Sequence, residues 1–177
     1  MSENFSVIKK KFIMILQFNF ANVSLSNRVT ISISAYPPLK KGVETSMIKF
    51  ETKSLPEEYE IAPDGSEIRP LLRLSGGGLA HCTLPTSRTS LASSHETVEE
   101  IWYCIQGRGQ VWRKQADQED TVNVRSGISL TIPVGTHFQF RNTGREPLCF
   151  IICTMPPWLG NHEASRVQEH WQPSRTQ

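Results

Sequence analysis

Two glycine-punctuated segments of the chain constrain its fold more than any other feature. The first runs from His95 to Gly109 and the second from Gly127 to Asn142. In both, short apolar runs are broken by glycine or polar turns, which is typical of strands joined by tight connections. Similar runs follow one another from Ile68 onward. The sequence therefore predicts an all-β protein whose short strands form the two packed sheets of a jelly roll.

The spacing of apolar runs and turns places the individual strands. A turn at residues 63–66 precedes the first strand, and Gly107-Arg108-Gly109 closes a hairpin between two later ones. The only helical periodicity lies in the tail, over His162–His170. The strands are expected at Ile68–Leu74, Leu79–Leu84, Ile101–Ile105, Gln110–Arg113, Thr121–Val124, Ser129–Ile132, Thr136–Arg141 and Leu148–Met155.

The two segments resemble the signature motifs of the cupin superfamily, G-x5-H-x-H-x(3,4)-E-x6-G and G-x5-P-x-G-x2-H-x3-N. Three positions depart from this pattern: Ser87 replaces the leading glycine, Ser93 the first histidine and Phe138 the last histidine. The resemblance covers about residues 76–156 and implies a double-stranded β-helix, the cupin jelly-roll barrel. The matching residues are His95, Glu100, Gly107, Gly127, Pro133, Gly135 and Asn142.

The chain divides into four parts around this expected barrel. Residues 1–46 form an irregular N-terminal extension that fits no packed element, so Met47 is a candidate for the true initiator. Residues 47–75 form an arm and the first strand. The cupin barrel spans 76–157, and 158–177 form a C-terminal tail.

Charge and cysteine content exclude several classes of partner. The basic excess of the chain lies in its first 46 residues, and the remainder is slightly acidic, so no basic face is expected for nucleic acid. The apolar run Phe12–Leu16 is too short to span a membrane. No C-x-x-C pair occurs, which favours buried, reduced thiols and a cytoplasmic protein. The four cysteines are Cys82, Cys104, Cys149 and Cys153.

The cupin motifs commonly supply three histidines and one glutamate to a divalent metal. The resemblance thus implies that His95 and Glu100 bind iron, manganese, nickel or zinc; without a metal they would form a hydrogen-bonded pair. A third ligand would come from His137, one residue before the expected position, or from His81. Strand alternation turns His137 outward if Phe138 points inward, whereas a local bulge would turn it inward.

Aromatic residues predict a pocket for a small molecule. An apolar cavity with a few polar groups is the usual composition of such a site. Trp112 fits a core position better, and the segment 155–158 would cover the barrel mouth or contact a partner subunit. The expected pocket residues are His81, Ser93, Trp102, Phe138 and Phe140.

Three functions are compatible with these residues. The first is a barrel that binds a small molecule, with or without a metal. The second is a metal-dependent enzyme resembling cupin dioxygenases or isomerases, with His95, Glu100 and His137 as ligands. The third is a metal-free enzyme similar to epimerases or lyases, in which His95 is the base and Glu100 orients it.

A homodimer is also expected. The strand around Ile101, Tyr103 and Ile105 is apolar on both faces, so its outer face needs cover. Either the segment Ile68–Leu84 or a second subunit would provide it, and the resemblance to cupins, which pair their barrels, favours the subunit.

Overall fold

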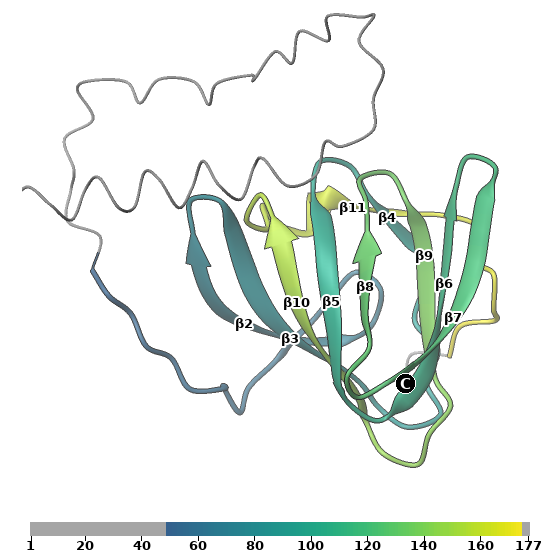
Figure 1. Cartoon of the computed structure of the whole chain (residues 1–177), viewed down its shortest axis with the longest axis horizontal. Helices are drawn as coiled ribbons and strands as arrows, with labels where there is room; N and C mark the ends of the chain where they lie inside the picture. The colour runs from purple at the N-terminus through teal and green to yellow at the C-terminus, as the bar shows by residue number, and fades with distance from the viewer. Residues whose placement is uncertain (1–48, 175–177) are drawn as a thin grey trace, which may run out of the picture. The chain divides into compact units, whose positions relative to one another are not determined.

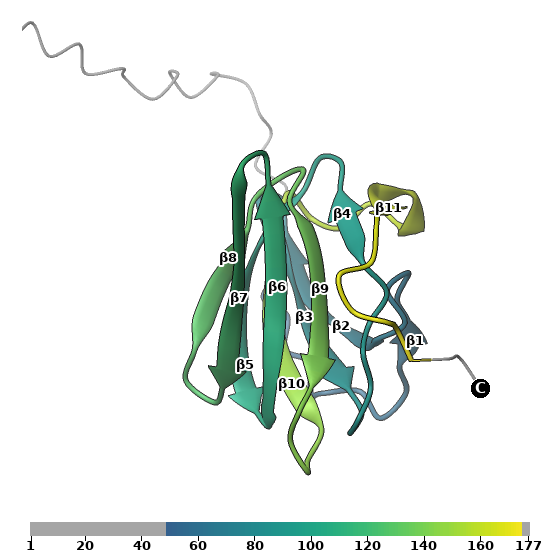
Figure 2. The same ribbon diagram turned by 90° about the vertical axis from the view of Figure 1, so that its right-hand side faces the viewer.

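The computed structural model describes residues 49–174, which form two antiparallel β-sheets that face each other (Figures 1 and 2). The six-stranded sheet has the order β1-β2-β3-β10-β5-β8, and the five-stranded sheet has the order β11-β4-β9-β6-β7. Within the described range there is one short 3-10 helix, η1 (Asn161–Glu163), and no α-helix. The prediction of an all-β fold is confirmed.

The strands of the six-stranded sheet are β1 (Glu60–Ile61), β2 (Glu67–Leu74), β3 (Gly77–Leu84), β10 (Leu148–Met155), β5 (Glu99–Gln106) and β8 (Ser129–Ile132). Those of the five-stranded sheet are β11 (Ala164–Arg166), β4 (Ser93–His95), β9 (His137–Asn142), β6 (Arg108–Gln115) and β7 (Gln118–Arg125). All eight strands expected from the sequence are present, with ends that differ by at most a few residues. The helix expected at His162–His170 is wrong, because this segment begins in η1 and continues into β11.

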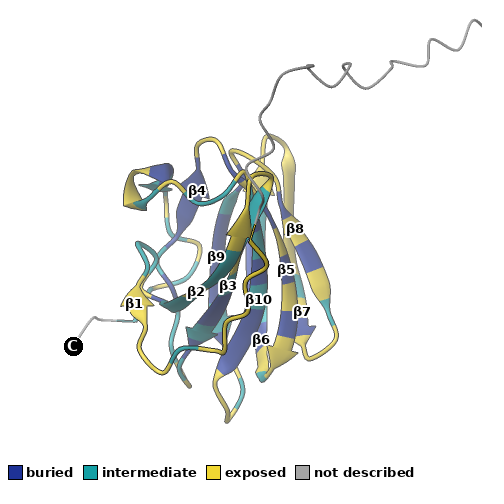
Figure 3. Cartoon of the chain, turned by 90° about the vertical axis from the view of Figure 1, so that its left-hand side faces the viewer, coloured by how far each residue is buried: buried dark blue, intermediate teal, exposed yellow. Residues whose placement is uncertain are grey.

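The hydrophobic core lies between the inner faces of the two sheets. Side chains alternate along β5, where Trp102 and Cys104 are buried while Ile101 and Tyr103 are exposed (Figure 3). Trp102 contacts Phe140 of the facing sheet edge-on, with ring centroids 5.1 Å apart. Aromatic pairs of this geometry add to the stabilisation from burial. The core is therefore built from both sheets, with Trp102 at their junction.

The outer face of the six-stranded sheet is not covered in the way that the sequence allowed. The segment Ile68–Leu84 does not cover this face, because β2 and β3 extend the same sheet beyond β10. Ile101, Tyr103 and Ile105 are consequently 46%, 48% and 37% exposed. Pairing in the sheet follows backbone hydrogen bonds, so strands next to each other cannot also cover each other's faces.

The homodimer stays a prediction, and this exposed apolar face is the reason to test it. Light scattering at micromolar concentration should give twice the 20.0 kDa mass of the chain. Tyr103→Glu, which places a charge on the exposed face, should shift the mass toward that of the monomer. A monomer in the unmodified protein would contradict the prediction.

The C-terminal segment packs on the outer face of the five-stranded sheet. Gln139 on β9 is completely buried, and its Nε2 donates to the carbonyl oxygens of Ser90 and Trp171 and to the Glu169 carboxylate, each at 2.8 Å. Its Oε1 accepts from the backbone amides of His170 and Trp171. One buried side chain thus fixes three consecutive residues of the tail.

Trp112 lies beneath the same segment. Its ring stacks on His170 with centroids 4.8 Å apart, and its Nε1 donates to Glu119 at 2.8 Å. Trp112 is therefore a packed residue outside the cavity. The extension at residues 1–46 and the hypothesis that Met47 is the initiator lie outside the described residues. None of the helices in residues 49–174 has the length and hydropathy to cross a membrane.

Candidate functional site

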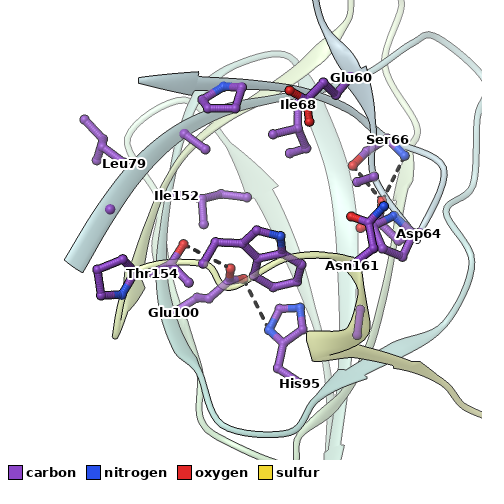
Figure 4. A pocket seen from close by; sticks show the side chains of 18 of the residues that line it. Glu60, Asp64, Ser66, Ile68, Leu79, His95, Glu100, Ile152, Thr154 and Asn161 are labelled. Carbon is purple, nitrogen blue, oxygen red and sulfur yellow. Dashed lines mark hydrogen bonds and ion pairs between the residues drawn. The ribbon is translucent and has the colours of Figure 1, made fainter. Parts of the chain in front are cut away.

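A cavity of about 310 Å³ opens between the two sheets at one end of the core (Figure 4). Strands β4, β5, β9 and β10 supply Ser93, His95, Glu100, Trp102, Phe138, Ile152 and Thr154 to its lining. The turn before β2 adds Asp64 and Ser66, and the segment after β10 adds Trp158 and Asn161. Its volume lies at the lower end of the range for small-molecule sites.

Glu100 is a buried acid at the cavity, and its environment shifts its pKa. It is 6% exposed, its Oε2 accepts a 2.7 Å hydrogen bond from Trp102 Nε1, and its Oε1 lies 3.5 Å from Thr154 Oγ1. Trp102 can donate to it because residues two apart on a strand point to the same face. Burial raises the pKa of Glu100 to about 7, and the nearby Asp64 charge adds to this effect.

His95 lies beside Glu100, with its Nδ1 3.8 Å from Glu100 Oε2. The imidazole is 6% exposed and stands edge-on between Phe138 and Trp158, with ring centroids 5.0 and 5.2 Å away. Burial lowers the pKa of His95 to about 4, although the Glu163 charge opposes this shift. The imidazole is therefore neutral at physiological pH.

Two buried polar atoms at the cavity lack a hydrogen-bond partner among the described residues. These are the Oγ of Ser93, which is 1% exposed, and the Nδ1 of His95. Buried polar groups are nearly always hydrogen-bonded, because an unsatisfied one keeps its desolvation penalty. Both atoms are thus available to a molecule in the cavity.

A buried carboxylate from the C-terminal segment positions the loop that carries His95 into β5. Glu163 accepts hydrogen bonds from the backbone amides of Thr97 and Val98 and from Thr97 Oγ1. Burial of Glu163 acts to raise its pKa, but these hydrogen bonds together hold that pKa below its usual value. The segment following β10 therefore orders the His95 side of the site.

The structure brings five of the predicted site residues together. His95, Glu100, Ser93, Trp102 and Phe138 all line the cavity. Their binding roles stay predictions.

Three other predicted residues lie elsewhere, and strand geometry explains each position. His137 lies on the opposite face of β9 from Phe138, so no bulge turns it toward His95. His81 lies on the outer face of β3, in register with Ile151, and its Nδ1 is 3.4 Å from Thr83 Oγ1. Phe140 is fully buried in the core against Trp102 and Phe150.

The residues present do not fit the metal that the cupin resemblance implies. Ser93 and Phe138 occupy two of the four donor positions, and they are paired in register across β4 and β9. The Phe138 ring packs on His95 where a further histidine would approach. Within residues 49–174, no three His, Cys, Asp or Glu side chains are grouped to hold a metal ion. A stable site for zinc or iron needs three or more such donors.

Asp64, Thr154 and Trp158 are among the cavity residues that were not in the predicted set. Asp64 lies in the turn 62–66, and its Oδ1 accepts from the backbone N and the Oγ of Ser66 at 2.8 and 2.6 Å. Burial raises the pKa of Asp64, while these hydrogen bonds oppose the shift. Thr154 is the cross-strand neighbour of Glu100. Trp158 lines the cavity and contacts His95, which agrees with the expectation that the segment 155–158 covers the barrel mouth.

The fold and the motif residues together define a cupin. The family model described as a cupin domain matches residues 80–154. An uncharacterized protein of Methanocaldococcus jannaschii is 32% identical over 127 residues, which is 66% of this chain and 97% of the relative. The chain belongs to the cupin superfamily.

Solved structures show the same fold at low sequence identity. The capsular polysaccharide assembling protein CapF from Staphylococcus aureus is 13% identical, with a TM-score of 0.54 over 66% of this chain and 35% of CapF. Oxalate decarboxylase from Bacillus subtilis is 18% identical, with a TM-score of 0.53 over 63% of this chain and 30% of that protein. This chain therefore spans about a third of the length of these solved proteins.

Proposed function

We propose that the protein binds a small organic molecule in the cavity between its sheets, inside the jelly-roll barrel that the cupin signature predicts. The observation that carries this proposal is the pair of unpartnered polar atoms, Ser93 Oγ and His95 Nδ1, at a cavity with aromatic walls. A ligand with an apolar body and one polar group would satisfy both atoms and contact Trp102 and Phe138. Such convergence of few polar groups in an apolar cavity is the usual basis of small-molecule recognition.

The alternative function, a metal-dependent cupin enzyme of the dioxygenase-like or isomerase-like type, requires a further donor beside His95 and Glu100. A metal-free enzyme with His95 as base is also poorly matched, because the pKa of His95 is lowered to about 4. A general base works best when its pKa lies near the working pH. These two side chains are better suited to hold a ligand than to act as that catalytic pair.

Benzyl alcohol is a suitable first probe, because it combines one ring with one hydroxyl. Ligand-observed NMR should detect saturable binding with a dissociation constant in the millimolar range, about −4 kcal/mol, as expected for a molecule of this size. Ala80→Phe, which fills the cavity from β3, should weaken binding about ten-fold or more.

Ser129→Phe is the matched control, since residue 129 is exposed on β8 and does not line the cavity. It should leave probe binding unchanged. Absence of saturable binding to the unmodified protein, or equal binding to the Ala80→Phe variant, would contradict the proposal.

A further inference from the structure

Three acidic residues line the cavity. Glu60 on β1 is exposed, whereas Glu100 and Asp64 are withdrawn from water and come from different parts of the chain. Glu100 enters from β5, and Asp64 enters from the turn that precedes β2 (Figure 4). This turn is fixed in place, because the backbone amide of Leu91 donates to the carbonyl oxygen of Asp64 at 2.8 Å. Both acids line the same cavity, and the Asp64 charge adds to the rise in the pKa of Glu100.

Within residues 49–174, no buried arginine or lysine lines the cavity beside Glu100 and Asp64. Arg73 is the only arginine or lysine among the described residues that line the cavity, and it is exposed. The hydrogen bonds that the two acids accept from side chains and from Ser66 come from neutral groups: the indole of Trp102, the hydroxyl of Thr154, and the amide and hydroxyl of Ser66. Carboxylates that are withdrawn from water favour a nearby positive charge, since burial alone disfavours their ionised form.

Two further polar atoms at the cavity can accept a hydrogen bond from a donor group on a ligand. His95 Nδ1 is buried without a hydrogen-bond partner, and a neutral imidazole offers one ring nitrogen as an acceptor. Ser93 Oγ is likewise buried and unpartnered and can accept a hydrogen bond. Aromatic side chains on the cavity wall, Trp102, Phe138 and Trp158, attract cations through the faces of their rings.

We infer that the cavity selects an organic amine, a small molecule with an apolar body and a protonated amino group. An ammonium group carries N–H donors and no acceptor, and Glu100, Asp64 and His95 offer acceptors at the cavity; the apolar body of the ligand would contact the aromatic wall. An anionic ligand of the same size should bind more weakly, because it would lie beside Glu100 and Asp64 with no buried arginine or lysine in the cavity lining. This inference rests on the proposed function and adds the chemical class of the ligand.

Three probes of matched size separate charge from shape: benzylamine, benzyl alcohol and benzoate. Titration at pH 7, followed by ligand-observed NMR, should show benzylamine binding at least about ten-fold more tightly than benzyl alcohol, with no saturable binding of benzoate. Asp64→Asn and Glu100→Gln should each reduce the preference for benzylamine over benzyl alcohol at least about three-fold. The exposed Glu99→Gln on β5 is the matched control and should leave it unchanged.

The outcomes distinguish this inference from the function on which it rests. If benzyl alcohol and benzylamine bind equally, or if benzoate binds best, the inference that the cavity selects an amine is wrong, whereas the proposal that it binds a small molecule stands. The same conclusion follows if neither Asp64→Asn nor Glu100→Gln changes the preference while both variants remain folded by circular dichroism. If none of the three probes binds, the proposed function fails, and the inference fails with it.

Discussion

Gln139→Ala should release the C-terminal segment from the five-stranded sheet and lower the free energy of unfolding by about 3 kcal/mol. The buried amide of Gln139 bonds to Ser90, Glu169, His170 and Trp171, and alanine replaces none of these contacts. Each lost hydrogen bond costs about 1 kcal/mol, and a buried group left unsatisfied costs more. Urea unfolding measures the change, and hydrogen exchange at the amides of His170 and Trp171 should show lost protection.

Gln115→Ala is the control for this variant. Gln115 is exposed and makes one side-chain hydrogen bond, to the carbonyl oxygen of Val134 at 2.9 Å. Its loss should change stability by less than about 1 kcal/mol. Unchanged protection of residues 170 and 171 in Gln139→Ala would mean that the tail is held by other contacts.

Glu100→Gln should gain stability relative to the unmodified protein as the pH rises. The pKa of Glu100 is about 7 in the folded state against 4.5 for the ordinary side chain, so the unfolded chain loses this proton first. Below about pH 4.5 Glu100 is protonated in both states, so its ionisation does not reduce the free energy of unfolding. As the pH rises from about 4.5 to about 7, the unfolded chain ionises while the folded protein keeps the proton, and the free energy of unfolding of the unmodified protein falls. A tenfold difference in the proton dissociation constant of Glu100 between the folded and unfolded states corresponds to about 1.4 kcal/mol. The stability of Glu100→Gln relative to the unmodified protein should therefore rise by about 3 kcal/mol across this window.

The burial of His95 has the opposite effect on how stability depends on pH. Its pKa of about 4 in the folded state means that stability falls as the pH drops from about 6.5 toward 4. This contribution is present in both proteins and largely cancels in their difference. Urea unfolding of both proteins at several pH values gives the difference directly, with Glu99→Gln as control. A difference that stays constant from pH 4 to pH 8 would show that Glu100 is not perturbed by burial.

The sequence was sufficient to predict the strands that carry the core. These strands have apolar runs bounded by glycine or polar turns, and the pattern depends only on neighbouring residues. It missed β1, β4 and β11, which are two or three residues long. The segment at β4 reads as a run of serines, Ser93-Ser94-His95, and its strand conformation depends on pairing with β9 and β11. Such pairing between distant segments has no local signature.

The candidate site was predictable where the motifs fix the register. The resemblance to cupins implied that His95 and Glu100 point into the barrel, and both line the cavity with Ser93. Strand alternation left His137 and Phe138 as alternatives, and the structure places Phe138 inward and His137 on the opposite face. Asp64 was recognised only as part of a turn, because its position at the cavity depends on contacts between distant segments. Trp158 was left between two locations for the same reason. The sequence thus predicted site residues that lie within a motif or a regular strand, and it did not predict those that reach the cavity through packing between distant segments.

The cavity extends beyond the matched cupin domain, and this has a consequence for how such proteins diverge. Asp64, Trp158 and Asn161 line the cavity, yet all three lie outside residues 80–154. Glu163, which positions the loop beside His95, also lies outside this range. If the proposed function holds, sequence change at these flanking positions would alter the preferred ligand without changing the matched domain. Relatives that share the matched domain should be grouped by their flanks when their ligands are compared.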